Sequence, residues 1–200
     1  VLELESGEIF TGCQFGADKN ISGELVFTTS MVGYPESLTD PSYKGQILVI
    51  TYPLIGNYGV PSDDKDEFGL LKYFESSKIQ IDALIISDLN NYNYHWNSHK
   101  SLDNWLKKNN IPGLYSVDTR SLTILLREKG TINARIYNSF NNINKSINHV
   151  IPEFNNQYEN TNLVDMVSTK EIIELNKPIK TSNDDDTRFK IIVVDCGIKN

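Results

Sequence analysis

Apolar and polar positions alternate over the first 60 residues in short runs that are separated by Gly-bearing turns. Runs of this length, rich in β-branched and aromatic side chains, predict β-strands. Ser6-Gly7 lies between the first two runs and predicts a hairpin turn. Residues 46–52 are apolar at nearly every position, which is typical of a strand buried on both faces. The strands expected along the chain are residues 1–5, 9–16, 25–29, 46–52, 81–87, 114–117, 131–137 and 189–195.

Helical spacing of apolar residues appears in the second half of the chain. A first helix is predicted to end at residue 110, with Ser98 or Ser101 as its N-cap. The apolar positions that share one face of this helix, at i, i+3 and i+4, are Leu102, Trp105 and Leu106. This helix lies between two predicted strands, so the chain alternates between strand and helix from residue 81 onward.

A second helix is expected over residues 119–129, with Asp118 or Thr119 as its N-cap and Gly130 as its C-terminal stop. The side chains expected on its buried face are Leu122, Leu125 and Leu126. Residues 68–74 follow an acidic stretch and could form a short helix. A β-rich start followed by alternating helices and strands indicates an α/β fold with sheet and helix layers.

Composition excludes several classes of protein. Hydrophobic residues make up 39% of the 200 and charged residues 22%, as in globular proteins. The net charge of −7 argues against a nucleic-acid partner and against binding to an anionic membrane surface. No apolar run reaches the roughly 18 residues of a membrane-spanning helix. Two cysteines far apart in sequence fit a reducing compartment, so a cytoplasmic protein is expected.

The sequence predicts one domain, a linker and the start of a second domain. Residues 1–175 form one domain, and residues 176–188 read as an exposed linker because they contain Pro178 and the run Asp184–Asp186. Residues 189–200 are the start of a second domain, because a single apolar strand of the parallel type is not stable alone. We therefore expect the chain to be a piece of a longer protein. The many asparagines between residues 138 and 162 indicate polar loops rather than a function.

Residues that could carry chemistry are few. His95 and His99 have the i, i+4 spacing of two metal ligands on a helix, but no acid or cysteine completes a site and surface histidines are the favoured interpretation. Cys13 is expected to be a small core residue rather than a nucleophile. Cys196 could project into an active site, although a packed thiol is favoured. No phosphate-binding loop, dinucleotide motif or nucleophile elbow is present in the sequence.

Two dense polar loops flank the strand at 46–52. The first is expected to be an ordered loop over residues 31–45, and it contains the turn sequence Asp40-Pro41-Ser42-Tyr43. Such a turn holds the Ser42 hydroxyl where it can bond a small polar ligand. The second loop covers residues 51–59. Either loop could instead be an ordered turn with no ligand.

These loops carry a family resemblance. Residues 27–43 read F-T-T-S-M-V-G-Y-P-E-S-L-T-D-P-S-Y, and T-Y-P-L-I-G-N follows at 51–57. This part resembles the N-terminal domain of the small, glutaminase chain of carbamoyl phosphate synthetase. The D-T-R segment and the L-L-R-E-K-G segment within residues 118–130 are similar to a helix of the same family. Residues 193–200 resemble the first strand of its class I glutamine amidotransferase domain. The acidic segment at 63–79 and the Asn-rich stretch depart from the family pattern.

The resemblance implies a function and a set of partners. It implies an enzyme that hydrolyses glutamine and combines the ammonia with bicarbonate, using two ATP, to give carbamoyl phosphate. Ser42 matches the serine that the family uses in its glutamine site, and the catalytic cysteine, histidine and glutamate belong to the chain downstream of residue 200. The chain itself should therefore be inert and bind no cofactor. ATP and a divalent metal are expected in the synthetase part, which is either a separate large subunit or a fused region.

The resemblance also implies a three-layer β/β/α domain of the swivelling type, with one mostly parallel and one antiparallel sheet. The domain should dock on the synthetase part and on its own amidotransferase domain. The alternative function is a non-catalytic interaction or scaffold domain of an ammonia-dependent relative. Pyrimidine and arginine biosynthesis both remain open as pathways.

Overall fold

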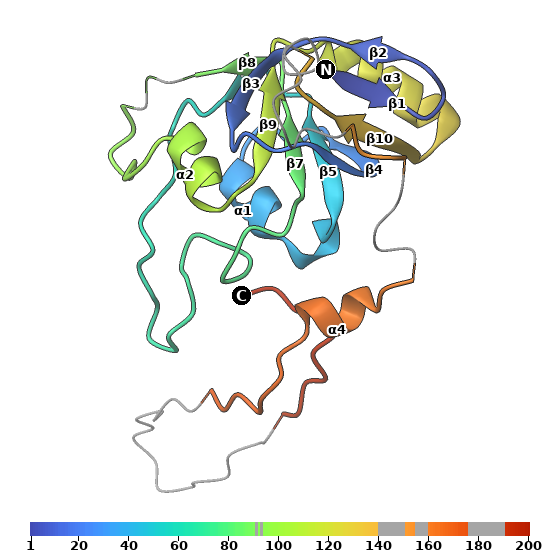
Figure 1. The fold of residues 1–200 in the computed structure, drawn as a ribbon. Coiled ribbons are helices and arrows are strands. Elements are labelled where there is room, and N and C mark those ends of the chain that lie inside the picture. Colours follow the sequence, from blue (N-terminus) through green and yellow to red (C-terminus); the bar gives the residue numbers. More distant parts are fainter. Residues whose placement is uncertain (91, 93, 140–150, 155–159, 176–190) are drawn as a thin grey trace, which may run out of the picture.

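The computed structural model describes residues 1–90, 92, 94–139, 151–154, 160–175 and 191–200 (Figure 1). An eight-stranded mixed sheet in the order β2-β1-β10-β4-β5-β7-β9-β3 forms its centre. The strands of this sheet are β1 (Leu2–Leu4), β2 (Ile9–Phe10), β3 (Cys13–Gly16), β4 (Ile21–Thr28), β5 (Gln46–Ile50), β7 (Ala83–Ile85), β9 (Pro112–Tyr115) and β10 (Ile132–Ile136). A second sheet pairs β6 (Leu54–Ile55) with β8 (Asp88–Leu89) in parallel.

The large sheet is parallel at its centre and antiparallel at both sides. Strands β4, β5, β7 and β9 run parallel to one another. On one side β10, β1 and β2 continue the sheet in antiparallel pairs, and on the other side β3 pairs antiparallel with β9. The α/β class is therefore confirmed. The parallel and antiparallel parts expected as two sheets are joined in one, because β10 pairs directly with β4.

Most predicted strands and both long helices are confirmed. The helices are α1 (Tyr34–Thr39), the 3₁₀ turn η1 (Pro41–Tyr43), α2 (Leu102–Lys108), α3 (Thr119–Lys129) and α4 (Leu163–Val167). Ser101 caps α2 by accepting a hydrogen bond from the Asn104 N–H, and Asp118 caps α3 through the Ser121 N–H. Gly130 ends α3 with a φ of 84°, in the left-handed region that glycine adopts readily.

The sheet is buried on both faces, as the apolar strand at 46–52 predicts. Leu48 and Ile50 of β5 point into a core shared with α1 and α2, whereas Ile47 and Val49 point into a core shared with α3. Strand β7 alternates in the same way. Because successive side chains of a strand point to opposite faces, a fully apolar strand needs a layer on each side. The helices supply those layers.

Two predictions of secondary structure are wrong. The expected loop at 31–45 contains α1 and η1. Residues 68–74 form no helix, because Gly69 has a φ of 83° and the Asp66 side chain accepts the Phe68 and Leu70 N–H groups in a turn. Residues 191–195 form no strand in the structure, and Ile192 is 92% exposed, as expected for an apolar strand that is not stable alone.

The two cysteines also differ from expectation. Cys13 is exposed rather than part of the core, because it lies on the edge strand β3, whose first two residues face solvent. Cys196 is exposed rather than packed, and both thiols are free. The predicted linker at 176–188 and most of the Asn-rich stretch lie outside the described residues. Among the residues that are described, no helix is long and apolar enough to cross a membrane.

Candidate functional site

The site lies at the end of the sheet where the parallel strands begin, that is, at their N-terminal ends; this end and the opposite one are called edges below. Helix α1 connects the end of β4 to the beginning of β5, so it carries the chain from one edge of the sheet to the other. Residues 28–33 lie at the edge where the strands end, and the turn with Ser42 lies at the opposite edge (Figure 1). A hydrogen bond confirms this placement. Gly45, just before β5, donates its N–H to the carbonyl of Gln80, which lies shortly before the neighbouring parallel strand β7.

The N-terminus of α1 is fixed by the second polar loop. Gly33 is the N-cap with a φ of 81° and offers no side-chain cap. The Tyr58 hydroxyl takes that role by accepting hydrogen bonds from the Gly33 N–H at 2.8 Å and the Tyr34 N–H at 3.1 Å. The Tyr34 hydroxyl in turn donates to the Gly59 carbonyl, and the two tyrosine rings stack at 4.3 Å. The two loops identified in the sequence are therefore joined through α1.

The C-terminus of α1 is fixed by the segment around residue 75. The Thr39 hydroxyl donates to the Pro35 carbonyl at 2.9 Å and accepts from the Glu75 N–H at 3.0 Å. The Ser76 hydroxyl donates to the Thr39 carbonyl at 2.6 Å. Helix α1 is thus held at both ends, which fixes the position of the turn that follows it.

The turn places Ser42 at the surface. The Asp40 carboxylate accepts a hydrogen bond from the Ser42 N–H at 2.9 Å and also interacts with the Ser42 hydroxyl. Asp40 itself is buried, whereas Ser42 is exposed. A serine hydroxyl has one donor hydrogen and two acceptor lone pairs. If its hydrogen points to Asp40, both lone pairs remain available to N–H donors of a ligand.

The last residues of the chain dock on this turn. In Figure 1 they form the red segment that passes α4 and ends at the label C. The ammonium group of Lys199 lies 2.6 Å from Oδ2 of Asp40. The N–H of Asn200 donates to the Glu75 carbonyl at 3.0 Å, and its side-chain amide donates to the Phe74 carbonyl at 3.2 Å. Asp40 therefore bonds the Ser42 turn with one oxygen and the C-terminal segment with the other.

The shape of the docked segment depends on Asp195. Its Oδ1 accepts hydrogen bonds from the Gly197 and Ile198 N–H groups, both at 2.8 Å, and its Oδ2 accepts from the Thr169 N–H at 2.6 Å. Gly197 has a φ of 100° and packs close to Val167 of α4. These bonds turn the chain so that Lys199 reaches the candidate site.

The charges at the site stabilise each other. Burial alone would raise the pKa of the Asp40 carboxyl, but the bonds from Lys199 and Ser42 outweigh it and hold that pKa below its ordinary value. The Asp40 carboxylate raises the pKa of Lys199. At neutral pH the site therefore contains a carboxylate and an ammonium group in contact, beside an exposed hydroxyl.

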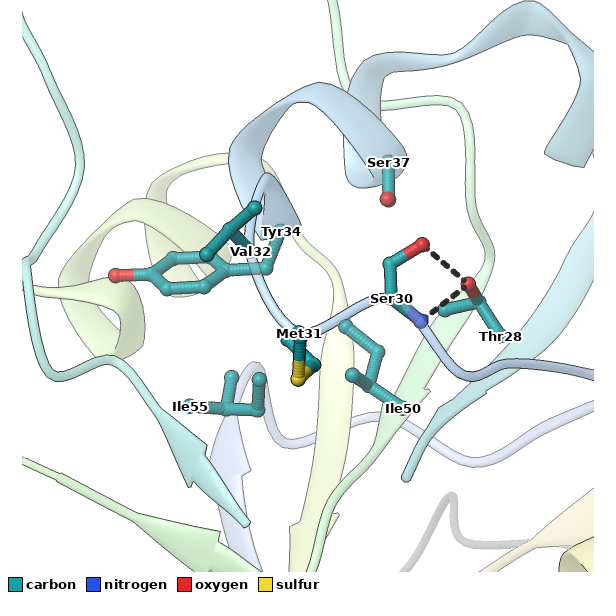
Figure 2. Close-up of a pocket in the computed structure, with 8 residues that line it drawn as sticks. All are labelled: Thr28, Ser30, Met31, Val32, Tyr34, Ser37, Ile50 and Ile55. Carbon is teal, nitrogen blue, oxygen red and sulfur yellow. Dashed lines mark hydrogen bonds between the residues drawn. The ribbon is translucent and has the colours of Figure 1, made fainter. Parts of the chain in front are cut away.

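A shallow pocket lies at the other end of α1. Figure 2 shows that Met31 lies near Ile50 and Ile55 there, with the Ser37 hydroxyl facing Ser30. The other residues that line it are Thr28, Val32 and Tyr34. The lining is mostly apolar and does not include Ser42, so this pocket is separate from the candidate site.

The structure brings together some predicted residues and leaves others apart. Ser42 stands in the expected turn at the surface. His95 and His99 belong to no group of three potential metal ligands within the described part of the chain. Sequence reasoning missed Lys199 as the ion-pair partner of Asp40 and Tyr58 as the group that caps the N-terminus of α1. Their contacts join distant parts of the chain, and no local pattern signals such a pair.

Comparison with known proteins agrees with the resemblance. The profile of the family "Carbamoyl-phosphate synthase small chain, CPSase domain" matches residues 2–136. The chain is 46% identical over 196 residues to the carbamoyl phosphate synthase arginine-specific small chain of Neurospora crassa, covering 98% of this chain and 41% of that protein. The corresponding Aspergillus fumigatus protein is 45% identical, with the same coverage. Multifunctional protein CAD of Squalus acanthias is 46% identical over 198 residues, which are 99% of this chain and 8% of that protein.

The chain thus spans less than half the length of the small chains it matches, and it corresponds to their N-terminal part. The profile match covers β1 to β10, that is, the whole large sheet and the turn with Ser42. The chain belongs to the family of carbamoyl-phosphate synthase small chains and contains their CPSase domain.

Proposed function

We propose that this chain is the N-terminal domain of a glutamine-dependent carbamoyl phosphate synthetase and that Ser42 contributes to its glutamine site. The enzyme would hydrolyse glutamine and combine the ammonia with bicarbonate, using two ATP. The observation that carries the proposal is the docking of the C-terminal segment on the Ser42 turn through Lys199. The part of the chain that resembles the start of an amidotransferase domain therefore approaches the one exposed hydroxyl that the resemblance assigns to glutamine.

The chemistry of Ser42 suits this ligand. Glutamine offers N–H donors in its ammonium group and in its carboxamide, and the Ser42 oxygen can accept from either. The nucleophile, its histidine and glutamate, and the oxyanion hole would come from the downstream part. ATP and a divalent cation would bind the synthetase part, and no residue of this chain is assigned to them. The synthetase part would be a separate large chain or a fused region.

Residues 176–188 would link this domain to the amidotransferase domain that begins near residue 189. The two exposed free cysteines support a reducing compartment, and we propose the cytoplasm. A scaffold domain in an ammonia-dependent enzyme is the second candidate, because the resemblance assigns the nucleophile that distinguishes the two functions to no residue of this chain. The exposed, hydrogen-bonded position of Ser42 favours the glutamine site.

The test uses the full-length enzyme and two nitrogen sources. Ser42→Ala should raise the KM for glutamine roughly ten- to hundred-fold, the value of one hydrogen bond to a charged ligand, and leave ammonia-dependent synthesis unchanged. The kcat should change little, because substrate and transition state keep the same contact. Ser42→Phe should block glutamine-dependent synthesis while ammonia still supports the reaction. Ser6→Ala, in the distant hairpin, is the matched control.

Two outcomes would contradict the proposal. If Ser42→Phe leaves glutamine-dependent turnover unchanged, the serine does not lie at the glutamine site. If the wild-type enzyme uses ammonia but not glutamine, the scaffold function is correct instead.

A further inference from the structure

The turn that carries Ser42 is held by the segment at residues 75–80, which we call the brace. The brace makes four hydrogen bonds to the positions just before and just after the turn. They join the Glu75 N–H to the Thr39 hydroxyl (3.0 Å), the Ser76 hydroxyl to the Thr39 carbonyl (2.6 Å), the Gln80 N–H to the Leu38 carbonyl (2.9 Å) and the Gly45 N–H to the Gln80 carbonyl (3.2 Å). The bonds at Leu38 and Thr39 fix the point where the turn begins, and the bond at Gly45 fixes the point where it ends.

A side-chain hydrogen bond joins the two ends of the brace. The Gln80 carboxamide donates from Nε2 to the Ser76 Oγ at 3.0 Å. A serine hydroxyl can accept one bond and still donate its own hydrogen. The carbonyls within reach of that hydrogen belong to Thr39, at 2.6 Å, and to Lys78, at 3.0 Å. Because Gln80 occupies a lone pair of the Ser76 oxygen, it leaves the hydrogen to point toward the residue that begins the Ser42 turn.

The burial of the Gln80 side chain is unfavourable in itself. Gln80 is 3% exposed and stands in the sequence between Ile79 and Ile81, two members of the apolar core. Its Oε1 is buried and has no hydrogen-bond partner in the described part of the chain. An amide oxygen that leaves water without finding a partner lowers the free energy of unfolding, and an apolar side chain of similar size avoids this cost. Stability therefore does not explain a glutamine at this position.

The position of the Ser42 hydroxyl decides whether it can bond a ligand. A hydrogen bond between a nitrogen and an oxygen forms over about 2.7–3.2 Å, so a shift of about 1 Å is enough to break it. Two main-chain bonds fix the shape of the turn. They run from the Tyr43 N–H to the Asp40 carbonyl and from the Lys44 N–H to the Pro41 carbonyl, both at 3.1 Å. These bonds do not determine where the turn lies relative to the sheet, whereas the brace does so because it continues directly into β7.

We propose that Gln80 and Ser76 are positioning residues for the Ser42 hydroxyl, and that the buried carboxamide of Gln80 serves this role at the expense of stability. This inference rests on the proposed function, in which the Ser42 hydroxyl bonds glutamine. Gln80 and Ser76 act on the substrate only through the turn. Their removal therefore weakens the use of glutamine and leaves the ammonia-dependent reaction unchanged.

Kinetics and thermal unfolding of the full-length enzyme test the inference together. Gln80→Leu keeps the size of the side chain but removes its N–H donor, and Ser76→Ala removes the hydroxyl that receives it. Both should raise the KM for glutamine roughly three- to tenfold, less than Ser42→Ala, because the Ser42 hydroxyl remains but is displaced. The kcat and the ammonia-dependent rate should stay the same. The melting temperature of Gln80→Leu should equal or exceed that of the wild type, so a general loss of stability cannot produce the change in KM.

Three further variants serve as controls. Ser76→Thr keeps the hydroxyl and should keep the wild-type KM. Thr123→Ala removes a matched bond, since the buried Thr123 hydroxyl donates to a main-chain carbonyl of α3 at 2.7 Å, and it should leave the KM unchanged because α3 lies on the other face of the sheet. In Ser42→Ala/Gln80→Leu the KM should equal that of Ser42→Ala alone, because a residue that acts through Ser42 has no effect once the hydroxyl is gone.

The outcomes separate this inference from the proposed function. If Ser42→Ala raises the KM but Gln80→Leu or Ser76→Ala does not, or if the effects in the double variant multiply, the inference fails and the proposed function stands. A lower melting temperature in Gln80→Leu also overturns the inference.

If Ser42→Ala itself leaves the KM unchanged, the proposed function fails, and hydrogen exchange of the full-length enzyme then tests the brace without any substrate. The amides of residues 40–45 should exchange faster in Gln80→Leu and Ser76→Ala than in Thr123→Ala, because a turn that has lost its support opens more often. Equal exchange rates in the three variants would overturn the inference.

Discussion

Asp40 uses its two carboxylate oxygens for two different purposes, and two substitutions separate them. Oδ1 accepts the Ser42 N–H at 2.9 Å and holds the turn, whereas Oδ2 pairs with Lys199 at 2.6 Å and holds the C-terminal segment. Asp40→Asn keeps an oxygen for the turn but removes the charge. Asp40→Ala removes both interactions. The difference between the two variants therefore measures the turn bond alone.

The structure sets the size of each effect. The side chain of Asp40 is 12% exposed, but that of Lys199 is 47% exposed, so solvent screens the ion pair. We expect Asp40→Asn to lower the free energy of unfolding by about 0.5–1 kcal/mol, as for a partly exposed pair. Asp40→Ala also removes the hydrogen bond by which the Asp40 carboxylate caps the turn at the Ser42 N–H, and this loss lowers the free energy of unfolding by a further amount of about 0.5–2 kcal/mol. Asp40→Ala should therefore lower it by about 1–3 kcal/mol in all.

The effect of pH follows from the direction of the shift. The pKa of Asp40 is lower in the folded chain than its ordinary value of 3.8, so near pH 4 the unfolded chain binds more protons than the folded one. The stability that the Asp40 charge contributes is therefore fully present at pH values above the ordinary pKa, and it is lost as the pH falls through the lowered pKa of the folded chain. Between pH 6 and pH 3, the wild type should lose more stability than Asp40→Asn.

Urea unfolding of the 200-residue chain measures these differences, and a double-mutant cycle identifies the pair. Lys199→Ala should cost about as much as Asp40→Asn, and the double variant should cost little more than either one. If the two losses are simply additive, or if Asp40→Asn is as damaging as Asp40→Ala, the two oxygens do not have the separate roles assigned here.

Three further predictions address the core, the helix cap and the activity. Leu126→Ala should lower the free energy of unfolding, measured by calorimetry, by about 2–5 kcal/mol because the side chain is 4% exposed. Ile124, on the same helix, is 46% exposed, and Ile124→Ala should change that free energy by no more than about 0.5 kcal/mol. Equal losses would mean that the buried face of α3 is misassigned. Tyr58→Phe should lower the free energy of unfolding in urea by about 1–3 kcal/mol, because the Gly33 and Tyr34 N–H groups lose their acceptor. A decrease below about 0.3 kcal/mol would show that the Tyr58 hydroxyl does not cap the helix. The 200-residue chain alone should not hydrolyse glutamine, because the resemblance places the nucleophile downstream, and hydrolysis above that of a heat-denatured sample would refute this.

The parts of the fold that were predictable have local signals. Helices α2 and α3 have their caps, Ser101 and Asp118, within three residues of the N–H groups they bind, and Gly130 marks the end of α3. Such signals are complete within a short stretch of sequence. The apolar run of β5 likewise predicts burial on both faces without knowledge of its neighbours.

The parts that were not predictable depend on distant contacts. Helix α1 was expected to be a loop because its cap is the Tyr58 hydroxyl, 25 residues away from Gly33, and not a neighbouring serine or aspartate. Ser42 could be placed in a turn from its own sequence, but the pairing of Asp40 with Lys199 joins distant parts of the chain and leaves no local signal. Cys13 was misplaced because a strand pattern does not show which strand lies at the sheet edge.

The most direct test of the central claim is a structure of the full-length enzyme with glutamine bound, in which the downstream nucleophile is replaced so that glutamine is not consumed. The measured quantity is the distance from the Ser42 Oγ to the nearest nitrogen or oxygen of glutamine. The proposed function predicts a hydrogen bond, at about 2.6–3.2 Å. The proposal would be contradicted if glutamine is bound but every polar atom of glutamine lies more than about 5 Å from the Ser42 Oγ, and the Ser42 hydroxyl bonds only Asp40.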